Sequence, residues 1–118
     1  MNGQWIGNYT GSSHGMIIVN IDERSTHYQG VVHLLESNTA LPSVVASFNT
    51  PDKSRDLHFR TVGIAPVNPL TGLFDVWDNV KTHYPDVNLS KYADVEGSWD
   101  EALLKLRWNT DIGVTGTY

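Results

Sequence analysis

Histidine is the residue of this chain best suited to act as a general base or a metal ligand near neutral pH. None of the five histidines pairs with another at the i,i+4 spacing of a helix or as His-x-His on a strand: His14, His27, His33, His58 and His83. The chain also has no cysteine, which excludes a thiolate metal site and a disulfide. We therefore expect no metal site.

Two carboxylates, Asp94 and Glu96, lie two positions apart in a segment of alternating polarity and so point to one face of an expected strand. Paired carboxylates carry out acid–base chemistry in glycoside hydrolases. The opposite face carries Val95, Gly97 and Trp99, which predicts that the two acids face solvent. The sequence contains no Gly-x-Ser-x-Gly elbow and no glycine-rich phosphate loop before a helix. We expect neither enzymatic activity nor a cofactor.

Aromatic residues are spread through nearly every expected element, and most of them should lie in the core. If the strands close into a barrel, inward-facing aromatic and polar side chains could surround a small molecule. The candidate ligand-binding residues are Tyr28, His33, His58, Arg60, Trp99 and Trp108. The alternative is an interior filled by side chains, which we favour because about eight strands enclose little more than side chains need.

Short apolar stretches of period two, separated by polar turns, are typical of antiparallel strands with one buried face. They predict about eight strands: residues 4–10, 16–22, 27–36, 43–49, 57–62, 92–99, a segment through 104–108, and 113–118. Apolar residues spaced at three and four predict one short helix near 73–84, which Pro85 ends. We expect a mostly β fold, an antiparallel meander that closes into a small barrel, with a sandwich as the alternative.

The length of 118 residues indicates one domain over residues 1–118. The formal net charge is −5 and no run of Lys or Arg occurs, which argues against nucleic acid or an anionic membrane as a partner. No apolar segment resembles a signal peptide or a membrane-spanning helix. We therefore expect a cytoplasmic protein.

The opening Gly3-Gln4-Trp5 is similar to the first strand of calycin barrels, the lipocalins and avidins, and Tyr28-Gln29-Gly30 is similar to the third strand of avidin-like proteins. This resemblance implies a calycin-like or streptavidin-like barrel. Two positions after the tryptophan, where an avidin has a biotin-binding asparagine, this chain has Gly7. The resemblance therefore does not imply biotin binding.

A longer resemblance covers nearly the whole chain and is carried by residues 5–9, 27–30, 40–43, 50–54, 75–84, 91–94 and 108–113. These segments resemble the amino-terminal module of bacterial proteins that carry a downstream FRG domain. The Phe-Arg-Gly signature is absent, because Phe59-Arg60 is followed by Thr61. The resemblance implies an accessory module that precedes an FRG domain, and it assigns no functional residue.

These observations predict a non-catalytic binding or interaction module at the head of a multidomain bacterial protein. The expected partners are the downstream domain of the same chain and a small molecule or a protein. One alternative is a small enzyme that uses His33, His58 and Tyr28 around a barrel pocket. Another is a structural domain that packs on its neighbour through the helix near 73–84.

Overall fold

The computed structural model describes residues 2–37, 43–66 and 92–118. Nine strands lie in these ranges: β1 (Gly3–Gly11), β2 (Gly15–Glu23), β3 (Tyr28–Glu36), β4 (Val44–Asn49), β5 (Asp56–Arg60), β6 (Gly63–Pro66), β7 (Ala93–Asp100), β8 (Leu103–Thr110) and β9 (Thr115–Thr117). A mostly β, antiparallel fold is thus confirmed. The helix expected near 73–84 lies outside the described residues.

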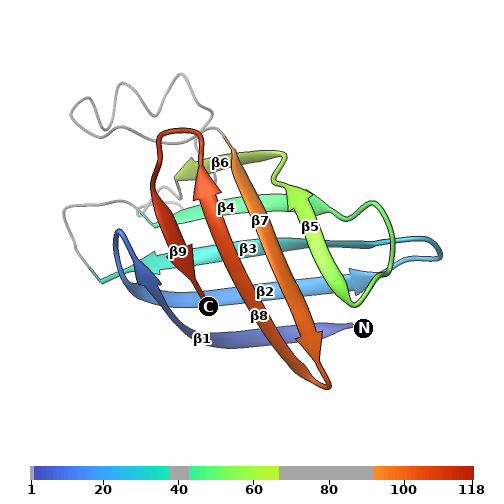
Figure 1. The fold of residues 1–118 in the computed structure, drawn as a ribbon. Helices are drawn as coiled ribbons and strands as arrows, with labels where there is room; N and C mark the ends of the chain where they lie inside the picture. The colour runs from blue at the N-terminus through green and yellow to red at the C-terminus, as the bar shows by residue number, and fades with distance from the viewer. Residues whose placement is uncertain (1, 38–42, 67–91) are drawn as a thin grey trace.

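All nine strands belong to one antiparallel sheet in the order β5-β7-β8-β9-β1-β2-β3-β4-β6. The sheet folds into two layers, one of β2, β3, β4 and β6 and the other of β5, β7, β8 and β9. The first strand joins them, because Gly3–Tyr9 pairs with β2, whereas Thr10 and Gly11 pair with β9. Figure 1 shows β2, β3 and β4 running across the direction of β7 and β8, so the sheet curls over itself as a half-barrel. The two layers enclose the apolar faces of their strands between them.

The period-two pattern explains which side chains form the core. In β2, Ile17, Val19 and Ile21 are buried and alternate with less buried neighbours. In β8, Leu104, Leu106 and Trp108 follow the same rule, as the sequence pattern predicts. The inner faces of both layers contribute to a single core cluster.

The route of the chain after β4 differs from the predicted meander. The sequence predicts that the strand at 57–62 pairs with its predecessor, but β5 pairs with β7, and it is β6 that pairs with the free side of β4. The change of layer occurs at two residues: the Thr61 N–H donates to the Ala93 carbonyl (2.9 Å) in one layer, and the Val62 N–H donates to the Ser47 carbonyl (2.8 Å) in the other. The expected fifth strand at 57–62 therefore ends early as β5, and Gly63–Pro66, for which no strand was expected, forms β6 as the additional ninth strand.

Thr61 also stabilises this corner through its side chain. Its hydroxyl oxygen accepts a hydrogen bond from the Ala93 N–H (2.8 Å), and both residues are buried. Thr61→Val should lower the free energy of unfolding by about 1–3 kcal/mol, because it leaves a buried N–H without an acceptor. Urea denaturation followed by circular dichroism measures this change. Thr61→Ser retains the hydroxyl and is the control; equal stability losses in the two variants would contradict this assignment.

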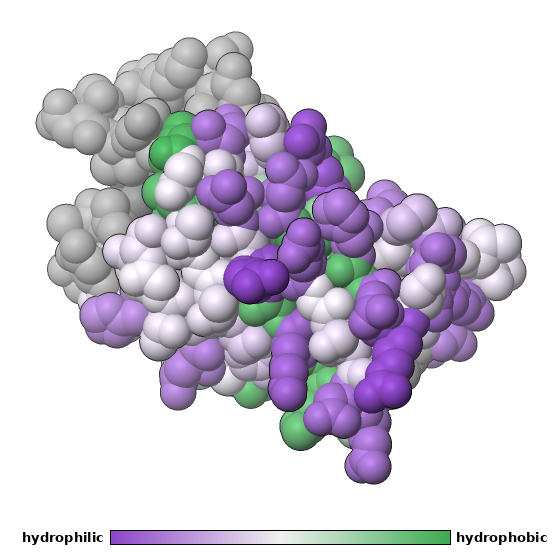
Figure 2. Space-filling view, in the orientation of Figure 1, coloured by the Kyte–Doolittle hydropathy of each residue, from purple (hydrophilic) through white to green (hydrophobic). Residues whose placement is uncertain are grey.

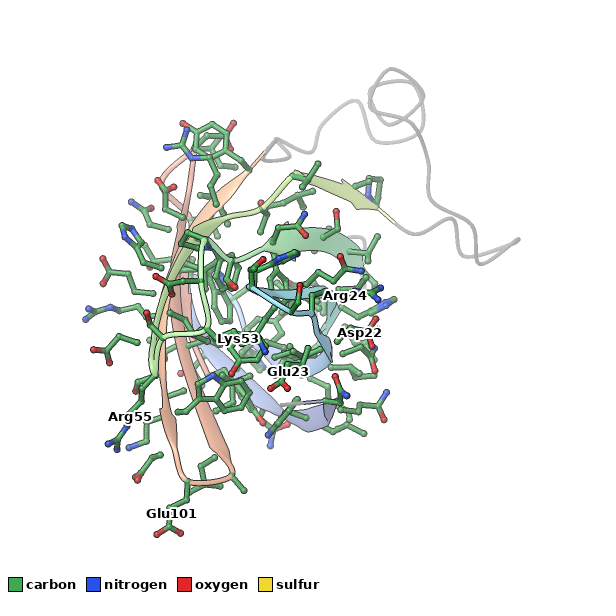
Figure 3. The ribbon with its side chains drawn as sticks, turned by 90° about the vertical axis from the view of Figure 1, so that its right-hand side faces the viewer. Asp22, Glu23, Arg24, Lys53, Arg55 and Glu101 are labelled. Atoms are coloured by element: carbon green, nitrogen blue, oxygen red, sulfur yellow. The ribbon has the colours of Figure 1, made fainter. Side chains whose placement is uncertain are left out.

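Aromatic rings fill the end of the half-barrel where β1 and β3 begin and β7 ends. Trp99 lies 5.0 Å from Trp5 and 6.1 Å from Tyr28 between ring centroids. The Trp5 indole N–H donates to the Ala102 carbonyl (3.0 Å) in the β7–β8 turn. Near this end, Lys53 reaches Glu23 on β2 at 3.8 Å (Figure 3). This end is referred to below as the aromatic end.

The outer surface of the β5-β7-β8 layer is polar, as the sequence predicts for Asp94 and Glu96. Asp94 pairs with Arg60 (2.8 Å) and Glu96 pairs with Arg107 (3.2 Å), and all four side chains are exposed. Hydrophilic side chains spread over this surface in Figure 2. Exposed ion pairs of this kind contribute little to the free energy of unfolding, so the main effect of the two carboxylates is to make this face hydrophilic.

Candidate ligand-binding site

A cavity of about 240 Å³ lies between the two layers at the end opposite the aromatic end. Its walls are the inner faces of β2, β3, β4, β7 and β8, with apolar side chains that include Ile17, Leu34, Val44, Val95, Leu106 and Trp108. Several inner positions here are small, among them Ala46 and Ala93, and this leaves space that larger side chains would occupy. The interior is thus filled at one end and hollow at the other.

One side of this apolar cavity carries polar groups from three different segments. Tyr9 lies at the end of β1 and is only 2% exposed, yet its hydroxyl has no hydrogen-bond partner. Glu36 lies at the end of β3, where its Oε1 accepts a hydrogen bond from the Ser13 hydroxyl (2.8 Å) and its buried Oε2 has no partner. All three residues line the cavity. We call Tyr9, Ser13 and Glu36 the polar triad.

The polar triad combines two adjacent segments, the end of β1 and the loop after it, with the distant end of β3. The inner face of β1 includes Trp5 and Tyr9, which places the phenol beside the Trp108 ring (5.7 Å between centroids). Glu36 lies opposite Gly15 in the β2–β3 ladder, at the end of a strand whose inner face begins at Tyr28. The loop between β1 and β2 then brings Ser13 over the carboxylate. Strand register therefore fixes the positions of the phenol and the carboxylate.

Burial raises the pKa of the Tyr9 phenol well above its ordinary value, and the neighbouring Glu36 carboxylate raises it further, while Ser13 has a smaller opposing effect. Neither neighbour forms a hydrogen bond of ordinary geometry with the phenol oxygen, although both are near enough to influence its pKa. Tyr9 is therefore a neutral phenol at neutral pH, able both to donate and to accept a hydrogen bond.

The raised pKa of Tyr9 predicts a loss of stability in alkali. The unfolded chain releases this proton near pH 10, whereas the folded protein retains it, so a rise of pH above about 10 favours the unfolded state. This contribution to stability is fully present below pH 10. Above it, the free energy of unfolding should fall by up to about 1.4 kcal/mol per pH unit more in the wild type than in Tyr9→Phe. Urea denaturation of both proteins between pH 9 and pH 11.5 tests this prediction. If the free energies of unfolding of the two proteins fall in parallel as pH rises, the prediction is contradicted.

The structure does not bring the six candidate ligand-binding residues of the sequence together. Tyr28 and Trp99 are buried at the aromatic end. His58 and Arg60 are exposed on the outer face of β5, where Arg60 also lies over the Tyr92 ring at 4.2 Å.

The remaining two candidates lie on opposite sides of the sheet. His33 pairs with Ile18 and Val45 on the outer face of β3, the side away from the cavity. Trp108 alone of the six lines the cavity. Among the described residues, no group of three or more His, Asp or Glu side chains is arranged to hold a metal ion.

No residue of the polar triad is among the six candidate ligand-binding residues, although the sequence indicates on which face of their strands Tyr9 and Glu36 lie. Glu36 is an even number of positions from Tyr28 within one predicted strand, so the two must share a face. Tyr9 shares a face with Trp5 by the same rule. The alternation of side chains along each strand places both Tyr9 and Glu36 on the inner face, but their proximity depends on pairing across the sheet.

Comparisons with known proteins give no match: no family model, no curated protein and no solved structure is similar to this chain. Within residues 2–37, 43–66 and 92–118, no helix is long and apolar enough to cross a membrane. A functional proposal must therefore be based on the cavity and its polar triad.

Proposed function

We propose that this chain is a non-catalytic binding module that holds a small, mostly apolar molecule in the cavity between its two layers. The observation that carries this proposal is that two buried polar atoms of residues lining the cavity, the Tyr9 hydroxyl and Glu36 Oε2, have no hydrogen bond of ordinary geometry. Buried polar atoms in native proteins nearly always have a partner, because leaving one unpaired costs about 1–3 kcal/mol. A bound molecule with a polar end would supply that partner.

The size of the cavity limits the ligand. Pockets for drug-sized molecules have volumes of roughly 300–1,000 Å³, and this cavity of about 240 Å³ is smaller. A molecule with one aromatic ring or a short branched chain and a single polar end fits these dimensions. The apolar walls would contribute affinity, and the polar triad would set the orientation.

The arrangement of the polar triad supports binding over catalysis. General acid–base chemistry at neutral pH is most effective with a group that titrates near that pH, whereas the pKa of Tyr9 is displaced away from neutrality. The enzyme alternative relies on His33, His58 and Tyr28, which lie on an outer face of β3, an outer face of β5 and the aromatic end respectively. These three side chains do not converge on one substrate position.

We also propose that the half-barrel is completed as a closed, calycin-like barrel where β5 passes into β6. The support is the corner at Thr61 and Val62, whose consecutive N–H groups bond to different layers (2.9 and 2.8 Å). Closure at this corner would enclose the cavity on a further side. In this proposal the protein is cytoplasmic, and it is the module that precedes an FRG domain in a bacterial protein, as the sequence resemblance implies for the second part.

The outer face of β1, β2 and β3 favours a second role, contact with the downstream domain of the same chain. Ile6, Met16 and Leu35 are 57%, 45% and 39% exposed on this face, and Met16 pairs directly with Leu35. Apolar side chains gathered on a sheet face are typical of a contact surface. Leu35→Lys should weaken association with the downstream domain and leave the affinity for a ligand in the cavity unchanged. If the variant loses both the association and the ligand affinity, the outer face and the cavity are not independent surfaces.

Titration with 2-phenylethanol tests the proposed binding function. The alcohol carries one ring and one polar end, so we expect a 1:1 adduct in native mass spectrometry and a melting temperature that rises with ligand concentration. A small molecule retained through purification would give the same support. Absence of both the adduct and the thermal shift at millimolar concentration, with this alcohol and with charged probes of the same shape, would contradict the proposal.

A further inference from the structure

The Glu36 carboxylate is an unusual group to find on an apolar cavity wall. The Ser13 hydroxyl donates to Oε1 (2.8 Å), and Oε2 is buried beside the Tyr9 phenol without a hydrogen bond of ordinary geometry. Within the part of the chain that the structure describes, the Lys and Arg ion pairs involve Glu23, Asp94, Glu96 and Asp100, not Glu36. The carboxylate thus has a neutral donor and no described cation.

A carboxylate in apolar surroundings is stabilised most by a cation that also donates hydrogen bonds. A neutral alcohol or amide can donate to Oε2, but its hydrogen bond is weaker than a charge-assisted one. A second carboxylate would be repelled by Glu36. The charge at this wall therefore discriminates among ligands that the apolar walls alone would accept equally.

The polar triad also matches the hydrogen-bonding capacity of a protonated primary amine. An ammonium group carries three N–H donors and no acceptor. The triad offers three oxygen acceptors: Glu36 Oε2, the Tyr9 hydroxyl, which stays neutral because its pKa is raised, and the Ser13 hydroxyl oxygen. Since the Ser13 hydrogen is directed to Glu36 Oε1 (2.8 Å), the lone pairs of its oxygen remain to accept.

From the uncompensated carboxylate and the neutral oxygens beside it, we infer that the ligand of this cavity is a small hydrophobic amine, bound as the ammonium with its nitrogen at the polar triad. This inference rests on the proposed binding function and names its ligand class. The apolar remainder of the molecule extends along Ile17, Val95 and Trp108 into the cavity.

The first test compares three probes of similar shape on the 118-residue chain by calorimetry at pH 7: 2-phenylethylamine, 2-phenylethanol and 3-phenylpropionate. We expect the amine to bind about tenfold more tightly than the alcohol, and the anion to bind most weakly. If the alcohol binds as tightly as the amine, or the anion binds most tightly, the amine inference is overturned and the binding function stands. If none of the three binds, the binding function itself fails, and the inference with it.

The second test assigns the preference to Glu36. Glu36→Gln keeps the size of the side chain and removes its charge, so the tenfold preference should fall to within about twofold while affinity for the alcohol changes little. Glu96→Gln removes a carboxylate from the exposed outer face and is the matched control, expected to leave the preference unchanged. A tenfold preference that persists in a folded Glu36→Gln protein overturns the inference. If that variant does not fold, Tyr9→Phe provides the second test: it removes one acceptor, and an unchanged affinity for the amine overturns the inference.

Discussion

Trp99→Ala lowers the free energy of unfolding by about 3–5 kcal/mol. Trp99 is 5% exposed and its ring contacts both Trp5 (5.0 Å) and Tyr28 (6.1 Å). Truncation removes the buried indole of the aromatic end and leaves a void that the two neighbouring rings cannot fill without leaving their own contacts. Its indole N–H has no partner among the described residues, so the loss is one of packing alone. Urea denaturation followed by circular dichroism measures the change.

Leu103→Ala is the matched control for this prediction. Leu103 lies four residues further along the chain, at the start of β8, and is 64% exposed. Its truncation should change the free energy of unfolding by no more than about 0.5 kcal/mol. A Trp99→Ala protein as stable as Leu103→Ala would show that the aromatic end is not the filled part of the core.

Ala46→Phe should abolish binding of ligands in the cavity, with a loss of affinity of at least about 100-fold, or about 2.7 kcal/mol. Ala46 lies on the inner face of β4 and lines the cavity, so a phenyl ring there would occupy the space that the ligand needs. Because the ring fills existing space, the stability of the protein should be unchanged or rise by up to about 2 kcal/mol. Calorimetry with 2-phenylethylamine measures the affinity, and urea denaturation measures the stability.

The neighbouring residue offers a control with the same side chain. Ser47 is exposed on the outer face of β4, because successive residues of a strand point to opposite faces. Ser47→Phe should leave the affinity unchanged. If Ala46→Phe binds the amine as well as Ser47→Phe does, the ligand does not occupy the cavity. If Ala46→Phe is strongly destabilised, the space beside Ala46 is smaller than the structure indicates.

Most strands could be predicted from the sequence, because burial of one face imposes a period of two that is visible locally. The order of the strands could not. The segment at 57–62 has the alternation of a meander strand, yet its N–H groups bond to two different layers at Thr61 and Val62. Gly63 is the only local sign of a bend here, and the change of partner depends on contacts between distant segments. The meander expected from the sequence is therefore wrong for this strand, because β5 pairs with β7.

The candidate site could be predicted only in part, for a related reason. Residue type drew attention to Tyr28 and Trp99, which are inward-facing but lie at the aromatic end. The sequence does predict the face of His33, since it lies an odd number of positions from the inward-facing Tyr28 in the same strand and so lies on the outer face. The proximity of Tyr9 to Glu36 follows from register across β1, β2 and β3, which the sequence pattern does not reveal.

Nuclear Overhauser effects between protein and ligand show whether the space between the two layers holds the ligand. With the protein saturated by 2-phenylethylamine, ring protons of the ligand should show contacts to the methyl groups of Ile17, Leu34 and Val95, which line the cavity. Contacts only to Ile6 and Met16, which are exposed on the outer face of β1 and β2, would show that the ligand binds outside the cavity.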